Sequence, residues 1–271
     1  MIIIITTAIF ALVLAFILGT ALGFFKEFFA VPQDPYEQAI RSALPGANCG
    51  ACGFPGCESY AREIASGKAG ITACPVGGSG VIEKLAGITG QAAKQEQPVV
   101  PVLVCQGSFL HTPRKGKYTG METCRGAKLA AGSTKLCTWG CLGYGDCTRV
   151  CKFGAIRMNV KKGLPRVDYK KCTSCRMCIS ECPQGILAGI PFNQKGAIPL
   201  CSNVSPDKKR AAKSCRIACI KCELCVRSCP KQCIVMKNNI PVVDWSKCDS
   251  CRVCVEKCPT KVFTLLEQIK I

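Results

Sequence analysis

The arrangement of the cysteines constrains this chain more than any other feature. It has 25 cysteines among 271 residues, and most of them stand in tight runs separated by two or three residues. A secreted disulfide protein spaces its cysteines to join distant segments, whereas C-x-x-C runs place several thiolates around one centre. Aromatic residues make up only 7% of the chain, so a large apolar core is not expected. The sequence therefore predicts small domains stapled by metal in a reducing compartment.

Two runs in the last quarter of the chain follow the pattern C-x2-C-x2-C-x3-C-P of bacterial two-cluster ferredoxins. Three thiolates of each run bind one [4Fe–4S] cluster, and the fourth, held before proline, binds the cluster of the other run. This crossing predicts one cluster bound by Cys219, Cys222, Cys225 and Cys258. It predicts a second cluster bound by Cys229, Cys248, Cys251 and Cys254.

The preceding pair of runs is only half regular. One run fits the pattern, but its partner has longer spacings and carries Lys152 in place of proline. Gly143 and Gly145 allow the longer run to bulge without strain. The same crossing then predicts one cluster bound by Cys137, Cys141, Cys147 and Cys182, and another bound by Cys151, Cys172, Cys175 and Cys178. Zinc is the alternative, since four cysteines also suit that ion.

A different constellation, C-x2-C-x4-C-x16-C, lies nearer the N-terminus. It consists of Cys49, Cys52, Cys57 and Cys74. Glycines between the first three cysteines let backbone N–H groups turn towards sulfur, which stabilises a reduced cluster. We expect a fifth [4Fe–4S] cluster here, with structural zinc as the alternative.

Five cysteines remain outside these sets. Cys233 follows Cys229 closely and is interpreted as an inert core residue. The others occupy two stretches, one before each ferredoxin-like unit: Cys105, Cys124, Cys201 and Cys215. A zinc site, another cluster and free thiols all remain open for these four.

An apolar segment near the N-terminus predicts a membrane anchor. Residues 2–25 contain no charged side chain, and a helix of this length spans about 36 Å, enough to cross a hydrocarbon core of about 30 Å. The segment lacks the basic start of a signal peptide and is longer than its usual apolar region. The cations Lys26 and Arg41 follow the helix, which predicts a single-pass protein of the cell (inner) membrane with its cluster domains on the cytoplasmic side.

The predicted fold class is α+β, built from small metal-stapled domains. A strand–turn–strand unit followed by a cysteine run occurs twice, over 157–183 and 235–259, which indicates duplication. We expect a transmembrane anchor (1–26), a helical 4Fe–4S domain (32–90), a linker (91–101) and two two-cluster ferredoxin domains (102–199 and 200–271). Within the helical domain, helices are expected over about 34–43, 58–66 and 81–85.

The formal charge of +19 makes the chain strongly basic, for which nucleic-acid binding is one interpretation and an offset to the negative charge of the clusters is another. Five clusters, each contributing about −2, would lower this charge to roughly +9. The basic runs 114–117 and 208–210 are either solvated faces or a docking surface for a redox partner, and small ferredoxins are typically acidic. Nucleic acid is not expected as a partner, because the anchor and the crossed runs indicate another role. Gly78-Ser79-Gly80 lacks a third glycine, so no flavin or nicotinamide site is predicted.

The order of anchor, helical cluster domain and tandem ferredoxin units resembles the B-subunit family of Rnf electron-transport complexes. The segment Gly140–Cys147 is similar to that family's stretched first run. The resemblance implies an electron-transfer subunit that accepts low-potential electrons from reduced soluble ferredoxin. Other subunits of the complex would then reduce NAD and move sodium ions or protons. No substrate chemistry is expected on this chain itself.

Two other functions remain as alternatives to this one. The chain could be the iron–sulfur subunit of another membrane-bound reductase, which would need an open coordination site or a flavin motif. It could also be a zinc-stapled nucleic-acid binder, which would be colourless and would bind with strong salt dependence.

Overall fold

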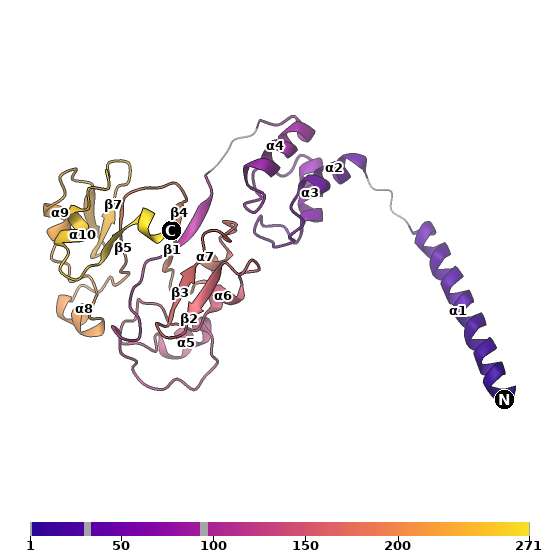
Figure 1. The fold of residues 1–271 in the computed structure, drawn as a ribbon, viewed down its shortest axis with the longest axis horizontal. Coiled ribbons are helices and arrows are strands. Elements are labelled where there is room, and N and C mark those ends of the chain that lie inside the picture. Colours follow the sequence, from indigo (N-terminus) through magenta and orange to yellow (C-terminus); the bar gives the residue numbers. More distant parts are fainter. Residues whose placement is uncertain (1, 30–33, 93–96, 271) are drawn as a thin grey trace.

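The computed structural model describes residues 2–29, 34–92 and 97–270. It consists of an N-terminal helix, a small helical unit and two α+β units, in that order along the chain (Figure 1). The mixed fold class predicted from the sequence is confirmed.

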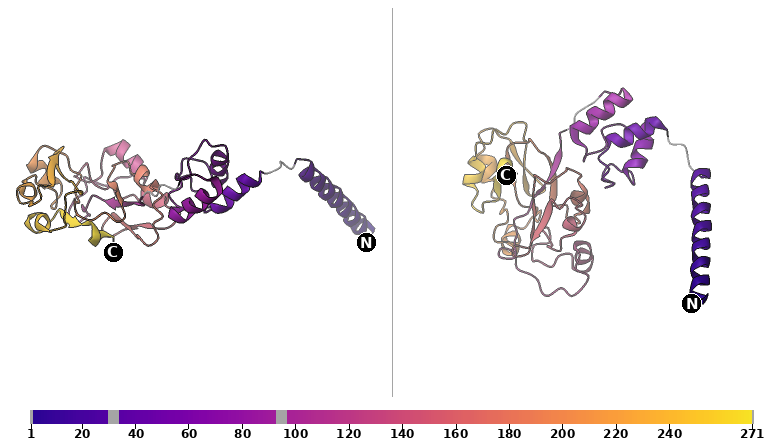
Figure 2. Two further views of the ribbon diagram at one scale, coloured as in Figure 1. Left: turned by 90° about the horizontal axis from the view of Figure 1, so that it is seen from above. Right: turned by 45° about the vertical axis from the view of Figure 1, so that its right-hand side comes forward.

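Helix α1 (Ile2–Phe28) contains the apolar segment. Its stretch Ile4–Lys26 is long and apolar enough to cross a membrane, and none of it is buried inside the protein. The helix stands away from the other units in every view (Figures 1 and 2). The Thr20 hydroxyl donates to the Phe16 carbonyl, so this polar side chain is satisfied within its own helix. These features are those of a membrane anchor.

The helical unit consists of α2 (Pro35–Ala43), α3 (Cys57–Ala65) and α4 (Gly78–Thr89). Asp34 caps α2 by accepting from the Tyr36 N–H, as its sequence predicts. Helix α4 is longer than the expected 81–85. Its buried residues Ile82 and Leu85 face the core, and it continues until Gly90 adopts the left-handed conformation that ends it.

The first α+β unit contains two antiparallel strand pairs, β1 (Val99–Leu103) with β4 (Leu187–Pro191) and β2 (Ile156–Asn159) with β3 (Leu164–Val167). Its helices are α5 (Cys124–Ala131), α6 (Asp146–Arg149) and α7 (Met177–Glu181). The linker expected over 91–101 is therefore too long. Residues 93–96 lie outside the described part, and 99–101 belong to β1 because Val100 and Val102 are buried against its partner strand.

The second unit repeats this arrangement. Strand β5 (Ala197–Pro199) pairs with β8 (Phe263–Leu265), and β6 (Ile234–Lys237) pairs with β7 (Ile240–Val243). Its helices are α8 (Lys208–Ser214), α9 (Leu224–Arg227), α10 (Val253–Lys257) and α11 (Leu266–Ile269). Because β5 pairs within this unit, the unit begins before the boundary expected at residue 200.

The two α+β units share an apolar core. Val102 and Ile190 from the first unit pack with Ile198 and Leu266 from the second. The Lys270 ammonium at the end of the second unit also donates to the carbonyl of Pro191 in the first, at 2.9 Å. The units are therefore packed together, and the loops that follow β1 and β5 lie at their junction.

Candidate iron–sulfur sites

The three regular cysteine runs share one backbone conformation. In each run, the residues two and four positions after the first cysteine have positive φ: Ser174, Arg176, Lys221, Glu223, Ser250 and Arg252. Non-glycine residues rarely adopt this conformation, which costs of order 1 kcal/mol each. It turns N–H groups towards the thiols, and the N–H groups of Ser174 and Lys221 donate to the sulfurs of Cys172 and Cys219.

The second α+β unit brings both predicted sets of cysteines together. One pocket is lined by Cys219, Cys222, Cys225 and Cys258. Another is lined by Cys229, Cys248, Cys251 and Cys254. Burial raises the pKa of Cys225 to about 11 and that of Cys254 to about 12. Cys233 also lines the second pocket, with its sulfur 3.4 Å from that of Cys229.

The donor set and its spacing fit a cluster better than a single ion. Zinc holds four sulfurs at about 2.3 Å, whereas a cubane of four irons is a larger body and keeps its ligands farther apart. Within the described residues, no group of three or more Cys, His, Asp or Glu is close enough to hold one metal ion. Four thiols around a pocket, with N–H groups donating to sulfur, are the environment that a [4Fe–4S] cluster requires.

In the first unit, Cys151 lies near the regular run of Cys172, Cys175 and Cys178, as the crossing predicts. Burial raises the pKa of Cys178 to about 12, and the neighbouring Cys175, Cys172 and Cys151 raise it further.

In the stretched run, the structure matches the cysteines to the regular pattern differently from the sequence prediction. Gly143 and Gly145 occupy its two left-handed positions, with φ of 88° and 79°, and the Gly143 N–H donates to the Cys141 sulfur. Cys141 therefore corresponds to the first cysteine of a regular run and Cys147 to the third. Tyr144 stands at the position of the second cysteine.

Cys124, which sequence reasoning left unassigned, lies beside this incomplete run. It lines one pocket together with Cys141, Cys147 and Cys182. Thr123 caps α5 by accepting from the Gly126 N–H, and the preceding N–H, of Arg125, donates to the Asp146 carboxylate at 3.0 Å. This contact holds the start of α5 against α6. The stretched run has no cysteine at its second position, and this absence was the sequence signal that a ligand from elsewhere, such as Cys124, was needed.

Cys137 does not share that pocket. The structure brings together Cys141, Cys147 and Cys182 of the set predicted from sequence, whereas Cys137 lines another pocket with Cys105, Cys201 and Cys215. This second pocket lies at the junction of the two α+β units.

In the helical unit, Cys52, Cys57 and Cys74 pack around one core. Burial raises the pKa of Cys74, and the nearby Cys52 and Cys57 raise it further. The Asn48 side chain, directly before Cys49, accepts from the Cys57 N–H at 2.8 Å and so closes the loop that carries the first three cysteines.

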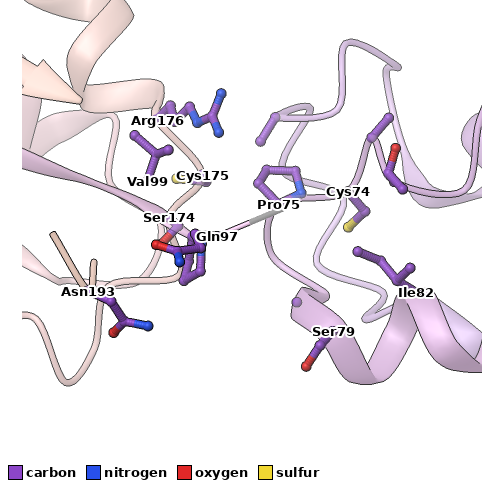
Figure 3. Close-up of a pocket in the computed structure, with 15 residues that line it drawn as sticks. Cys74, Pro75, Ser79, Ile82, Gln97, Val99, Ser174, Cys175, Arg176 and Asn193 are labelled. Atoms are coloured by element: carbon purple, nitrogen blue, oxygen red, sulfur yellow. The ribbon is translucent and has the colours of Figure 1, made fainter. Parts of the chain in front are cut away.

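The helical unit faces the first α+β unit across a cleft. Cys74 and Pro75 line one side, and Cys175 and Arg176 line the other (Figure 3). Lys152, which replaces the proline of the stretched run, donates from its ammonium to the Asn48 carbonyl at 3.0 Å. Two predicted sites, one in each unit, therefore face each other here.

Comparisons with known proteins find iron–sulfur domain families in the same parts of the chain. The FeS family model, which describes an Fe–S cluster domain, matches residues 44–76, and the 4Fe–4S dicluster domain model (Fer4_7) matches 136–186 and 218–265. The B subunit of the Na⁺-translocating ferredoxin:NAD⁺ oxidoreductase complex of Acetobacterium woodii is 43% identical, over 87% of this chain and 70% of the relative.

Two further relatives match at similar coverage. The B subunit of the ion-translocating oxidoreductase complex of Methanosarcina acetivorans is 36% identical over 87% of this chain and 88% of its own length. The B subunit of the proton-translocating ferredoxin:NAD⁺ oxidoreductase complex of Clostridium ljungdahlii is 34% identical over 87% of this chain and 82% of its own length. The protein thus belongs to the B-subunit family of Rnf-type ion-translocating oxidoreductase complexes.

Proposed function

We propose that this protein is a membrane-anchored electron relay that carries five [4Fe–4S] clusters in two tandem ferredoxin units and one helical domain. The observation that carries the proposal is that cysteines from separate runs lie together in three of the five sets of four. The five ligand sets are Cys49, Cys52, Cys57 and Cys74; Cys124, Cys141, Cys147 and Cys182; Cys151, Cys172, Cys175 and Cys178; Cys219, Cys222, Cys225 and Cys258; and Cys229, Cys248, Cys251 and Cys254.

The clusters would supply one-electron chemistry, and the chain supplies the ligands and their surroundings. Thiolates bind the irons, while N–H groups such as those of Ser174 and Lys221 stabilise the added negative charge of a reduced site. The buried cysteines Cys147 and Cys178 keep water away from their sites. No substrate bond is made or broken on this chain.

Electrons would enter from a reduced, acidic, soluble ferredoxin and leave to neighbouring subunits of the membrane complex. The basic runs 114–117 and 208–210 are exposed, and a backbone hydrogen bond from Arg216 to His111 brings the segments that carry them together. A positive surface attracts an acidic partner and speeds encounter. The names of the relatives from A. woodii and C. ljungdahlii support ferredoxin as the donor and NAD⁺ as the acceptor of the whole complex.

The anchor would place these domains on the cytoplasmic side of the cell membrane. Lys26 lies in the last turn of α1, and cations that follow a spanning helix favour the cytoplasmic face. Reduction of NAD and translocation of sodium ions or protons would then take place in partner subunits. The span Ile4–Lys26 has no ionisable side chain before Lys26 at its end, so it offers no ion path by itself.

The test replaces a ligand and compares the variant with one that is changed outside every ligand pocket. Cys225→Ser is expected to lose the iron of one cluster and to slow electron transfer from reduced ferredoxin to the assembled complex. Val235→Ala, at an exposed residue of β6, is the control and is expected to keep full iron and full transfer. Normal iron content and normal turnover in the Cys225→Ser protein would refute the assignment.

A further inference from the structure

Four cysteines that the five ligand sets do not use line a single pocket at the junction of the two α+β units. We propose that Cys105, Cys137, Cys201 and Cys215 bind a sixth [4Fe–4S] cluster, which joins the two ferredoxin units. Cys105 and Cys137 come from the first unit, and Cys201 and Cys215 come from the second. The proposal goes beyond the five-cluster relay, and it rests on the proposed function, in which this chain binds iron–sulfur clusters.

The sulfurs converge on this pocket. A methyl group at Gly140 would lie 3.5 Å from the Cys105 sulfur and 3.6 Å from the Cys137 sulfur. One at Gly107 would lie 3.6 Å from the sulfurs of both Cys105 and Cys215. Each pair of sulfurs is therefore no farther apart than about twice these distances. Glycine at both positions lets the backbone approach the sulfurs closely.

The thiols accept the same hydrogen bonds as the ferredoxin ligands. In two of the regular runs, the N–H two residues after the first cysteine donates to its sulfur, as Ser174 does to Cys172 and Lys221 does to Cys219. At the junction the same relation holds for three cysteines, whose donors are Gly107 to Cys105, Trp139 to Cys137 and Asn203 to Cys201. These loops thus have the local geometry of the cluster-binding loops rather than that of inert core cysteines.

A buried cation also lines the pocket. Lys135 is only 1% exposed, and its ammonium donates to the Gly107 carbonyl at 3.0 Å. None of the ion pairs among the described residues includes Lys135. A buried charge without a counter-ion is costly. An anionic cluster bound by four thiolates would supply the missing negative charge.

An unpartnered hydroxyl points to the same ligand. Thr112 lines the pocket, is 1% exposed, and its hydroxyl has no hydrogen-bond partner. It lies beside Gly107, whose added methyl group would come within 2.8 Å of it. Buried hydroxyls are nearly always paired, and a cluster sulfide would accept from this one.

The pocket also matches the size of a regular ferredoxin site. Its cavity volume is about 20 Å³, the same as that of the pocket of Cys219, Cys222, Cys225 and Cys258. The two sites are therefore alike in volume as well as in their four thiols.

The position between the units gives the site a role. The Cys105 sulfur accepts from the N–H of Cys141, a ligand of one ferredoxin unit, at 3.4 Å. The Cys201 sulfur accepts from the N–H of Cys219, a ligand of the other unit, also at 3.4 Å. The sixth site thus contacts a ligand loop of each unit. A cluster there would hold the two units together and would pass electrons from one unit to the other. On assembly, four thiols each lose a proton and form one iron–sulfur bond, with iron and sulfide supplied as for the other sites.

The test counts clusters in the full-length protein purified without oxygen. Six clusters predict about 24 iron and 24 acid-labile sulfide atoms per chain, and five predict about 20. Cys201→Ala and Cys215→Ala are each expected to lose about one sixth of the iron, whereas the control Val235→Ala, at an exposed residue of β6, keeps it all. About 20 irons in the parent protein, unchanged in both variants, would overturn the sixth site and leave the other five standing. One zinc per chain that disappears in both variants would also overturn it, and a protein without iron would refute the proposed function as well.

A second variant tests the site without removing a ligand. Thr112→Val keeps the shape of the side chain but removes the hydroxyl donor. We expect full iron content and a lower midpoint potential for one cluster, because the reduced state loses a hydrogen bond, while the potentials of the other clusters stay unchanged. Full iron with every potential unchanged would contradict a cluster beside Thr112.

Discussion

Tyr144 occupies the place at which the three regular runs carry their second cysteine, and this one residue explains why the cysteines of the first unit group differently from the sequence prediction. The sequence alone shows four cysteines in the stretched run, and counting along the chain groups Cys137 with Cys141 and Cys147. The positive φ angles of Gly143 and Gly145 show that the loop has the backbone geometry of a regular run, and Tyr144 leaves it one cysteine short. Cys124 lies far away in sequence, so no spacing rule could have supplied it.

The substitution of Cys124 for the missing ligand can be tested by rescue. Cys124→Ala is expected to lose the iron of one cluster, because the site at Cys141, Cys147 and Cys182 keeps only three thiolates. Adding Tyr144→Cys to this variant rebuilds a regular run and is expected to restore the iron, as measured by iron and sulfide analysis. If Cys124→Ala keeps all its iron, Cys124 is not a ligand.

Burial of the thiols predicts that cluster insertion depends on pH. Burial raises the pKa of both Cys147 and Cys178 to about 12, so in the cluster-free chain these thiols are protonated at neutral pH. Binding iron removes those protons, and higher pH therefore favours uptake. Anaerobic reconstitution is expected to be faster at about pH 9 than at about pH 7, followed by the rise of absorbance as iron and sulfide bind. A rate that falls with rising pH would contradict this account.

At the scale of elements, predictions succeeded where a local signal marks the boundary of an element. The Asp34-Pro35 pair predicts the start of α2, and the repeated strand–turn–strand pattern predicts both hairpins. Strand β1 was missed because it pairs with β4, which lies far along the chain. The linker prediction relied on the prolines and polar residues before β1, which carry no information about a distant partner strand.

Helix α3 holds the last ligand of the helical unit in place through one side chain. The buried Tyr60 hydroxyl donates to the Gly70 carbonyl at 2.8 Å and accepts from the Ala73 N–H, next to Cys74, at 3.2 Å. Tyr60→Phe leaves both backbone groups unpaired, which is expected to destabilise this unit by about 1–3 kcal/mol. Its cluster should then be lost at lower temperature, measured by the bleaching of absorbance on heating.

The control for this prediction is Tyr36→Phe, which removes a hydroxyl from a partly exposed tyrosine of the same unit. It is expected to leave the bleaching temperature unchanged. Equal behaviour of the two variants would show that the Tyr60 hydrogen bonds do not support the Cys74 loop.

At the scale of the whole molecule, the sequence predicts the order of the parts better than their junctions. The anchor, the helical unit and the two ferredoxin units follow from composition, repeats and cysteine spacing. The site shared by the two α+β units does not, because Cys105 and Cys215 approach each other only when the strands of both units pack into one core. Spacing rules describe cysteines within one loop. They give no information about cysteines that come together only when the two α+β units pack against each other.

The anchor and the cluster domains are expected to be separable. Helix α1 buries none of its candidate span in the rest of the protein, so deleting residues 1–29 should not disturb the ligand loops. The truncated protein is expected to remain in the supernatant when membranes are sedimented, with its iron content unchanged. Truncated protein that still sediments with membranes in the absence of partner subunits would contradict a role for α1 as the anchor.

The central claim is that the thiolates of this chain hold clusters that carry electrons, and an anaerobic reductive titration monitored by EPR tests it most directly. The purified full-length protein is expected to be brown, to bleach reversibly, and to take up about one electron for each cluster, with the signals of reduced [4Fe–4S] centres. A colourless protein that contains zinc and takes up no electrons would contradict the account.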